Sequence, residues 1–278
     1  MLTMAQKRKR NAILSAVIGW TLSLIILVPF AVIVVNSFKT TRDSAMMNLE
    51  WPRDGWVLSN YAEVLDGGQI LRSFFNSLLI ASGCVIICVI VTSMAMFVIK
   101  RRKAKLHRFI FYMFFAGLIA PVNYITTLQI LKFLHLNGTY FGTILTYAAL
   151  GVPFAAFMYY NFIGTIPKEI DEAAIIDGAN ISQLFFQVIF PLLKPVTVTV
   201  ATLTFISAWN DFVSPLYLLN SSSKWTMVLM VYNYWGVMQQ EWGKICAVIV
   251  LTLIPILIVY IAMQKYIIAG MTSGAVKG

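Results

Sequence analysis

Long runs of apolar residues, separated by polar segments, dominate the pattern along this chain. The hydrocarbon core of a bilayer is about 30 Å thick, so a spanning helix needs about 20 apolar residues. Six runs meet that requirement, and they lie at residues 12–35, 75–99, 109–131, 142–163, 196–219 and 245–263. The first run is too long for the apolar core of a cleavable signal peptide. Within the third run, Pro121 beside Asn123 predicts a helix break.

The fifth run needs a separate argument because it begins Val196-Thr-Val-Thr-Val200, which alternates like a β-strand. An open strand would leave its backbone groups unpaired in lipid, and a single strand makes no barrel. We therefore expect a helix there as well. The pattern predicts an all-α membrane protein with six transmembrane helices, and residues 1–278 form a single transmembrane domain.

Composition supports this fold class. Hydrophobic residues make up 59% of the chain, charged residues 12%, and the mean hydropathy is +0.80. Soluble domains average about 25% charged residues, so a soluble, disordered or coiled-coil protein is excluded. The three cysteines all lie in apolar runs, where we interpret them as small buried hydrophobic residues.

The basic residues indicate an orientation. Clusters at residues 7–10 and 100–108 are expected on the cytoplasmic side, because lysine and arginine accumulate in cytoplasmic loops. With six spans, that side carries 14 cations and 4 acids, whereas the outer side carries 7 of each. The net charge of +10 then lies entirely inside, and both termini are cytoplasmic. This explains the high pI without nucleic-acid binding, so no nucleic-acid partner is expected.

The loop at residues 164–195 is the longest that this topology places inside. Pro167 and the acidic residues that follow it favour a helix N-terminus, and Gly178 is placed to end that helix. A second short helix can start with Ser182 as its N-cap, and it should stop before Pro191. A helix lying on lipid headgroups is the alternative, but such helices are usually rich in lysine and arginine. A protein partner is the favoured interpretation.

Motifs in this loop and elsewhere resemble a known family. Glu172-Ala-Ala174, Asp177-Gly-Ala179, Ile189, Pro191 and Pro195 resemble the EAA loop of permeases from ATP-binding-cassette (ABC) importers. Further motifs are similar to those of the carbohydrate-uptake, MalG-like permeases of the binding-protein-dependent transport family. These are Asn60-Tyr61, Phe74-Phe-Asn-Ser-Leu-Leu79, Leu136-Asn-Gly-Thr-Tyr140, Trp209-Asn-Asp-Phe212 with Pro215-Leu216, and the C-terminal tail from Gln264.

The resemblance implies a type I ABC importer permease in a bacterial cell membrane. Its EAA helix would be a coupling helix that docks on a cytoplasmic ATPase, with Glu172, Ala173, Ala174, Asp177 and Gly178 as contact residues. The implied partners are a second homologous permease, two ATPase subunits, an extracytoplasmic solute-binding protein and membrane lipid. ATP and magnesium would bind to the ATPase. The implied substrate is a sugar, with an oligosaccharide favoured and glycerol-phosphate or a polyol as the alternative.

The chain itself shows no catalytic pattern. It has no G-x-x-x-x-G-K-[ST] loop for a nucleotide, and His107 and His135 have no Cys/His/Glu cluster around them. We therefore expect a non-enzyme with no cofactor or metal of its own. An intramembrane enzyme is disfavoured for the same reason. A stand-alone secondary carrier is disfavoured because no internal repeat and only one marginal intramembrane acid are visible.

That acid, Asp211, is the candidate for a solute pathway. Ionisable residues within a membrane usually face the bundle interior or a wet cavity. A stripe of polar residues precedes it in the fifth run, namely Thr197, Thr204, Ser207 and Asn210. The stripe either lines the pathway or packs against a neighbouring helix, with small residues such as Ala201 and Ala208 at the contact. The sequence leaves these two alternatives open.

Overall fold

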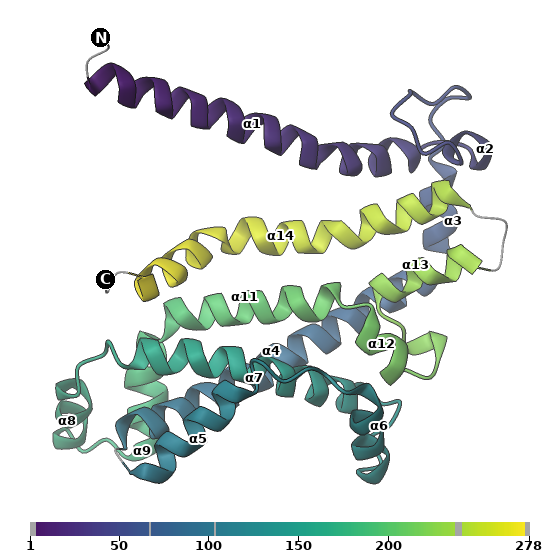
Figure 1. Ribbon diagram of the computed structural model, residues 1–278. Coiled ribbons are helices and arrows are strands. Elements are labelled where there is room, and N and C mark those ends of the chain that lie inside the picture. Colours follow the sequence, from purple (N-terminus) through teal and green to yellow (C-terminus); the bar gives the residue numbers. More distant parts are fainter. Residues whose placement is uncertain (1–3, 67, 103, 237–240, 276–278) are drawn as a thin grey trace. The chain divides into compact units, whose positions relative to one another are not determined.

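The computed structural model describes residues 4–66, 68–102, 104–236 and 241–275, and within these ranges it contains helices and loops without strands (Figure 1). The chain divides into two compact units. The first is Met1–Ile70 with Val231–Leu251, and the second is Leu71–Met230 with Thr252–Gly278. The prediction of an all-α protein is confirmed.

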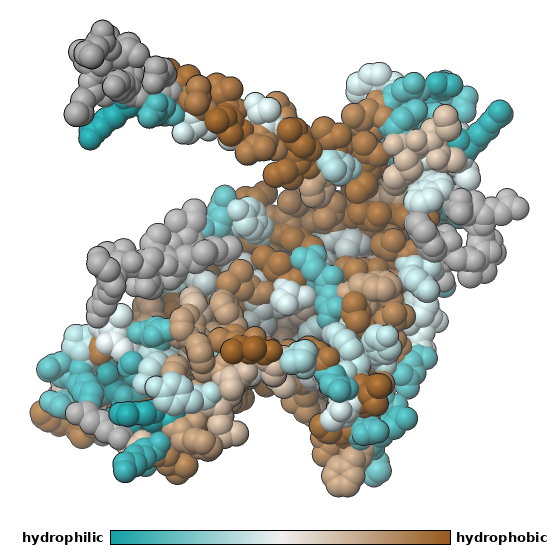
Figure 2. All heavy atoms as spheres, viewed as in Figure 1, coloured by the Kyte–Doolittle hydropathy of each residue, from teal (hydrophilic) through white to brown (hydrophobic). Residues whose placement is uncertain are grey.

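Four helices in the described part of the chain are long and apolar enough to cross a membrane. They are α1 (Met4–Asn36), α4 (Gln69–Arg101), α7 (Tyr140–Ile163) and α14 (Trp242–Ala275). Even α7, the shortest, has 24 residues, which at 1.5 Å per residue is about 36 Å. Continuous helices therefore enclose the first, second, fourth and sixth predicted runs. Hydrophobic residues cover the middle of α1, and hydrophilic residues gather where it leads into α2 (Thr41–Ser44) (Figure 2).

The third predicted run, residues 109–131, is two helices joined by a non-helical segment. Helix α5 (Lys105–Ala116) ends before Gly117, and α6 (Tyr124–Phe133) begins after Asn123. The side-chain oxygen of Asn123 accepts the backbone N–H of Thr126 at 3.1 Å, which is an N-cap. The break that Pro121 predicts is confirmed, and a straight helix over the whole run is wrong.

The fifth predicted run, residues 196–219, is also not a continuous helix. Helix α11 (Lys194–Asn210) ends where Asp211 adopts an extended conformation, with φ −74° and ψ 125°. A short helix, α12 (Val213–Leu218), follows. The apolar pattern continues through the break because both helices bury apolar residues, so composition alone did not reveal it.

The segment before α11 differs from expectation at both ends. Asn180, not Ser182, caps it: the Asn180 side chain accepts the N–H of Gln183, and the Gln183 side chain accepts the N–H of Asn180, both at 2.9 Å. The helix then continues past Pro191 through α9 (Ile181–Gln183), the π-helical turn η1 (Leu184–Ile189) and α10 (Phe190–Leu192). Pro191 has no backbone N–H and cannot donate the i→i−4 hydrogen bond of an α-helix. In the π-helical turn before it the hydrogen bonds run from residue i to i−5, so the bonding pattern has already changed where the proline lies.

A bend of 77° at Leu193 joins this segment to α11, and the two helices together are apolar enough for a fifth span. The described residues thus hold four or five candidate spans rather than six continuous ones. The core of the second unit lies where α4, α7, η1 and α11 meet. Its fully buried side chains include Met96, Tyr159, Ile163, Ile189 and Leu193.

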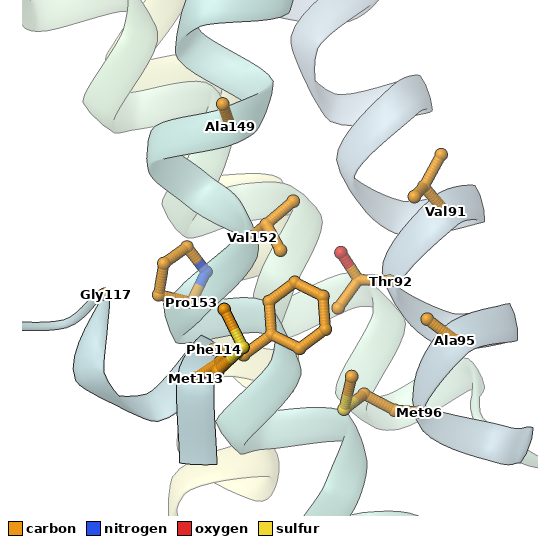
Figure 3. A pocket seen from close by; sticks show the side chains of 10 residues that line it. All are labelled: Val91, Thr92, Ala95, Met96, Met113, Phe114, Gly117, Ala149, Val152 and Pro153. Atoms are coloured by element: carbon orange, nitrogen blue, oxygen red, sulfur yellow. The ribbon is translucent and has the colours of Figure 1, made fainter. Parts of the chain in front are cut away.

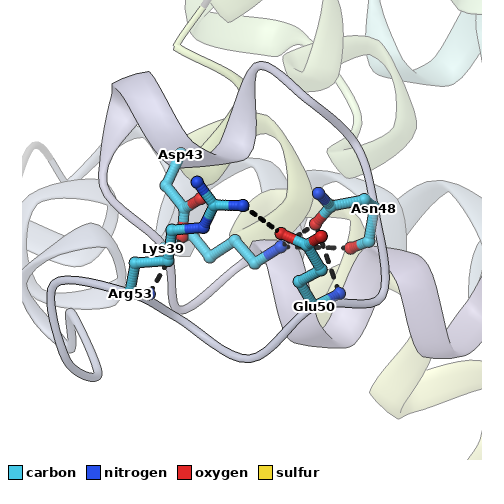
Figure 4. A network of polar contacts seen from close by, with 5 residues as sticks. All are labelled: Lys39, Asp43, Asn48, Glu50 and Arg53. Carbon is cyan, nitrogen blue, oxygen red and sulfur yellow. Dashed lines mark hydrogen bonds and ion pairs between the residues drawn. The ribbon is translucent and has the colours of Figure 1, made fainter.

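In the first unit, the segment after α1 is folded around a buried lysine (Figure 4). The side chain of Lys39 is 0% exposed, and its Nζ donates to the backbone oxygen and Oδ1 of Asn48 at 3.1 and 2.6 Å. Arg53 closes the segment by pairing with Glu50 at 2.7 Å and by donating its backbone N–H to Asp43 at 3.3 Å. A buried ammonium is tolerated only with such acceptors.

Asn60, in helix α3 (Ser59–Asp66), holds the same segment from its other side. Its Nδ2 donates to the backbone oxygens of Ser37 and Lys39 at 3.0 and 2.9 Å. The neighbouring Tyr61 hydroxyl is 2.7 Å from Ser37 Oγ. The Asn60-Tyr61 motif thus has a structural role, which is to close the loop that follows α1.

In the second unit, Asn76 connects three parts of the chain. Its Nδ2 donates to the backbone oxygens of Ser223 and Trp225, both at 3.0 Å, and its Oδ1 accepts the Tyr140 hydroxyl at 2.8 Å. Ser223 lies in the 3₁₀ turn η2 (Ser222–Lys224), just before α13 (Met227–Gly236). The motifs around Asn76 and Tyr140 therefore fix the ends of α4 and α7 to this turn.

Candidate functional site

The EAA segment, residues 164–195, contains the short helix α8 (Glu169–Ile176), which follows α7 after a connecting loop (Figure 1). Three acidic residues occupy its first turn, where the positive end of the helix dipole favours them. At the other end, the N–H of Gly178 donates to Ile175 and the N–H of Ala179 to Ala174, both at 3.0 Å. This is a Schellman cap, and it requires the left-handed φ of +85° that Gly178 adopts. The prediction that Gly178 ends the helix is confirmed.

The five residues singled out by the resemblance do not share one environment. Glu172, Ala173, Asp177 and Gly178 are exposed, whereas Ala174 is 9% exposed and belongs to the hydrophobic core. One face of α8 therefore packs on the chain itself, and the other presents two carboxylates and a small side chain. The buried alanine allows the helix to lie close to its own core.

Exposed isoleucines extend this surface, and the sequence reasoning did not select them. Ile175, Ile176 and Ile181 are 58%, 84% and 79% exposed. Contiguous exposed apolar side chains with a polar rim mark protein interaction sites. The available signal was an apolar pair, Ile175-Ile176, that directly follows Ala174 and precedes the terminating glycine. The surface combines apolar area with the acids Glu172 and Asp177.

An ion pair attaches α8 to the end of α4. Arg101 Nη2 donates to Asp171 Oδ1 at 3.0 Å, and Arg101 Nε lies 2.6 Å from Asp171 Oδ2. Arg101 Nη1 also donates to the backbone oxygen of Ile166 at 3.1 Å. Both charged side chains are only 13% exposed. One hydrogen bond and one close charge contact to the carboxylate, together with the bond to Ile166, thus attach α8 and the loop before it to the end of α4.

The polar stripe of the fifth run divides into two parts. Thr197 accepts the Tyr159 hydroxyl at 3.0 Å, and Thr204 is 7% exposed, so both pack within the unit. Ser207 and Asn210 are exposed, and they precede the half-buried Asp211. Thr204 is thus shielded from a solute, whereas Thr197, like Asp211, is half-buried and the other two are exposed.

Asp211 organises the break between α11 and α12. Its carboxylate accepts the backbone N–H groups of Val213 and Ser214 at 2.8 and 3.3 Å, and it also accepts the Ser214 hydroxyl. Ser214 Oγ is in turn 3.1 Å from the hydroxyl of Tyr124, the first residue of α6. The breaks in the third and fifth runs therefore meet at one polar cluster, defined by Asp211, Ser214 and Tyr124. The buried Tyr147 of α7 lies beside the same carboxylate.

No group of three or more histidine, cysteine or acidic side chains in the described ranges is placed to hold a metal ion. The three cysteines are buried as free thiols. The polar cluster at Asp211 and the surface of α8 are the features of the described residues that bear on the predicted sites.

Comparison with known proteins gives concordant results. Residues 2–273 match the family described as the inner membrane component of binding-protein-dependent transport systems. The chain is 32% identical to the diacetylchitobiose uptake system permease protein of Streptomyces coelicolor, covering 98% of this chain and 91% of that protein. It is 34% identical to the multiple sugar-binding transport system permease protein of Streptococcus mutans, covering 91% and 93%. The resemblance drawn from the motifs is confirmed.

A solved structure shares the fold. It is the crystal structure of a bacterial ABC transporter involved in the import of the acidic polysaccharide alginate. The TM-score is 0.84 at 22% identity, and the match covers 96% of this chain and 99% of that one. At this identity the likeness shows the fold alone.

Proposed function

Because the chain belongs to the family of binding-protein-dependent transport system inner membrane components, we propose that it is the permease subunit of an ATP-driven sugar importer. Members of this family are non-catalytic transport components of the cell membrane, and the chain is one of them. The related permeases are named for diacetylchitobiose and for multiple sugars, which favours an oligosaccharide. They do not favour the glycerol-phosphate or polyol alternative, and they disfavour a stand-alone carrier.

The observation that carries the mechanism is the attachment of α8 to α4 through Arg101 and Asp171. We infer that the exposed surface of α8 docks on a cytoplasmic ATPase, and that ATP-driven closure of two such subunits moves α8. A motion at α8 reaches the spanning helices only if the two are rigidly connected. The partly buried ion pair and the contact of Ala174 with the core provide that connection.

The contact itself combines two kinds of interaction. Ile176 and Ile181 supply apolar area that a partner would remove from water, and Glu172 and Asp177 supply charge at its edge. Ala173 is exposed between them and leaves room for close approach. ATP and magnesium would bind to the ATPase, since this chain has no phosphate-binding loop.

The orientation and the remaining partners follow from the same proposal. We place both termini and α8 in the cytoplasm, with six membrane crossings, two of them made by the broken runs. The basic clusters at residues 7–10 and 100–108 favour this orientation. None of the most apolar window of α1 is buried within the chain, which leaves that helix free to pack on a second permease. An extracytoplasmic binding protein would deliver the sugar.

We propose that the solute passes the polar cluster at Asp211. Ser207, Asn210 and Asp211 present hydrogen-bonding groups at the end of α11, and hydroxyl-rich solutes need such groups along their path. Two helix breaks meet there, and non-helical backbone at membrane depth is tolerated where it lines a cavity. We assign Thr204, which is buried, to packing, and also Thr197, which is half-buried and accepts the Tyr159 hydroxyl.

The direct test is purification of the tagged chain from its native membrane, followed by reconstitution. We expect the second permease in an amount equal to the chain and the ATPase in twice that amount, and ATP-dependent uptake of labelled oligosaccharides once the binding protein is added. If the chain is recovered alone and still transports without ATP, the proposal is wrong and the chain is a secondary carrier.

A further inference from the structure

An apolar groove of about 330 Å³ lies within the second unit, between α4, α5 and α7 (Figure 3). Side chains of all three helices line it, and Thr92 is the one polar residue among them. Val91 and Met113 at its rim are 53% and 61% exposed. The groove is therefore open at the surface of this unit, and an apolar occupant could enter it from the side.

The depth of the groove matches one half of a bilayer. Along α4, Met96 lies four residues before Lys100, which is about 6 Å. Along α5, Met113 lies eight residues after Lys105, which is about 12 Å. A leaflet holds about 15 Å of hydrocarbon, half of the 30 Å core. Its furthest lining residues, Val91 and Gly117, lie about 14 and 18 Å from Lys100 and Lys105. The groove thus begins below the polar ends of these helices and reaches about the middle of the bilayer.

The same ends of α4 and α5 carry three cations for which the described residues show no acidic partner. Arg101 is bound to Asp171, and Lys100 lies 3.9 Å from the ring centre of Tyr160. Arg102, Lys105 and Arg108 are exposed, and no ion pair is found for them among the described residues. The chain has no acidic residue at all between residues 67 and 168. Basic sites beside apolar grooves between spanning helices suit anionic lipid headgroups.

We propose that this groove binds an acyl chain of an anionic phospholipid whose phosphate pairs with Arg102, Lys105 and Arg108. Charge favours this occupant, because exposed cations at the ends of α4 and α5 attract an anionic headgroup more than a neutral one, and the depth of the groove suits an acyl chain. Gly117 contributes to the shape, since a Cβ there would lie 2.8 Å from Pro153 Cγ. The site is distinct from both the α8 surface and the polar cluster at Asp211.

The test uses the assembled transporter in phosphatidylcholine nanodiscs that contain a photoactivatable probe in small amount. The probe is phosphatidylglycerol or phosphatidylcholine with a diazirine on one acyl chain, and mass spectrometry of peptides locates the crosslinks. We expect the phosphatidylglycerol probe to label residues 91–96 and 113–117 several-fold more than the phosphatidylcholine probe. The readout does not depend on transport, so it can fail while the proposed function stands.

Variants that lack the three cations test whether the protein recognises the lipid headgroup or whether the groove only binds an acyl chain. The triple variant R102Q/K105Q/R108Q alters only exposed side chains, so it should fold, and it should reduce phosphatidylglycerol labelling to the phosphatidylcholine level. Lys132→Gln removes an exposed cation of α6 and should leave the ratio unchanged. Equal labelling by both probes in the unaltered protein overturns the proposal. Labelling that spares the groove but marks other faces of α4 also overturns it, because a protein partner then covers the groove.

Discussion

The guanidinium of Arg101, at the end of α4, binds both carboxylate oxygens of Asp171, which lies 70 residues further along the chain in α8. Neither residue stands out in the sequence, where Arg101 is one of several cations and Asp171 one of several acids. In the structure they connect α8, which carries the proposed docking surface, to the end of α4. Their side chains are largely shielded from water, so the pair is strongly directional.

Breaking this pair should uncouple ATP hydrolysis from transport. We expect Asp171→Asn to reduce uptake by about tenfold or more while the complex still assembles, because it removes the charge that holds the Arg101 guanidinium and so loosens α8 from α4. Sugar uptake and ATPase activity of the same proteoliposomes measure the coupling. Glu169→Gln neutralises an exposed acid in the same helix turn and should have little effect. Equal coupling in both variants would contradict the connecting role.

Replacing both members of the pair tests whether the connection between α8 and α4 needs the two charges or only contact between the side chains. Arg101→Met with Asp171→Leu removes the ion pair without leaving a buried charge, and such replacements are often neutral for stability. We expect this double variant to assemble better than Asp171→Asn alone while it transports less than the unaltered protein. Thermal unfolding of the purified complex and uptake together test this. Full uptake in the double variant would show that apolar contact is sufficient.

Gly178 should tolerate asparagine better than valine. Its φ of +85° is left-handed, and a side chain there costs about 1–2 kcal/mol, least for asparagine. A Cβ at this position meets no atom within 4 Å, so the cost is conformational rather than steric. We expect Gly178→Val to lower uptake and Gly178→Asn to retain most of it, at equal complex yield. Normal uptake for the valine variant would place the docking surface elsewhere.

Asp211→Ala should reduce uptake without loss of the assembled complex. The change removes the acceptor that holds the N–H groups of Val213 and Ser214, and it removes the charge from the proposed path. Asp211→Asn keeps an acceptor oxygen for these N–H groups but removes the charge, so it distinguishes the two effects. If the asparagine variant transports normally, the carboxylate acts through α12 rather than on the solute. A variant of the packed Thr204, Thr204→Val, provides the comparison, and we expect it to retain uptake.

Asn76→Leu should destabilise the protein without a specific effect on coupling. It removes three hydrogen bonds, to Ser223, Trp225 and Tyr140, and leaves buried polar groups unpaired at about 1–3 kcal/mol each. The expected result is a lower unfolding temperature in detergent and unchanged transport per assembled complex. Ser221→Ala, at an exposed position in the same loop, is the control. A loss of coupling at normal stability would give Asn76 a direct functional role.

Local patterns predicted the features that depend on local physics. The length of each apolar run predicted the long helices, Gly178 predicted the end of α8, and Pro121 predicted the break in the third run. The break at Asp211 was not predicted, because α12 continues the apolar composition of α11. The N-cap was placed at Ser182 rather than Asn180, since both residue types cap helices and only the reciprocal bonds with Gln183 distinguish them.

By itself the sequence determined that the chain is a helical membrane protein, and its motifs carried the resemblance to ABC importer permeases. The tertiary structure decided which residues of those motifs face outward and which pack inward. Ala174 is buried in the core, whereas Ile176 and Ile181 are exposed. Arg101 lies against Asp171, and Tyr124 lies against Ser214. The physical reason is that helix length and capping depend on neighbours within a few residues. An ion pair, or a contact between two helix breaks, joins residues that are far apart in the chain. Such residues come together only when the helices pack, so neighbouring residues in the sequence do not predict the contact.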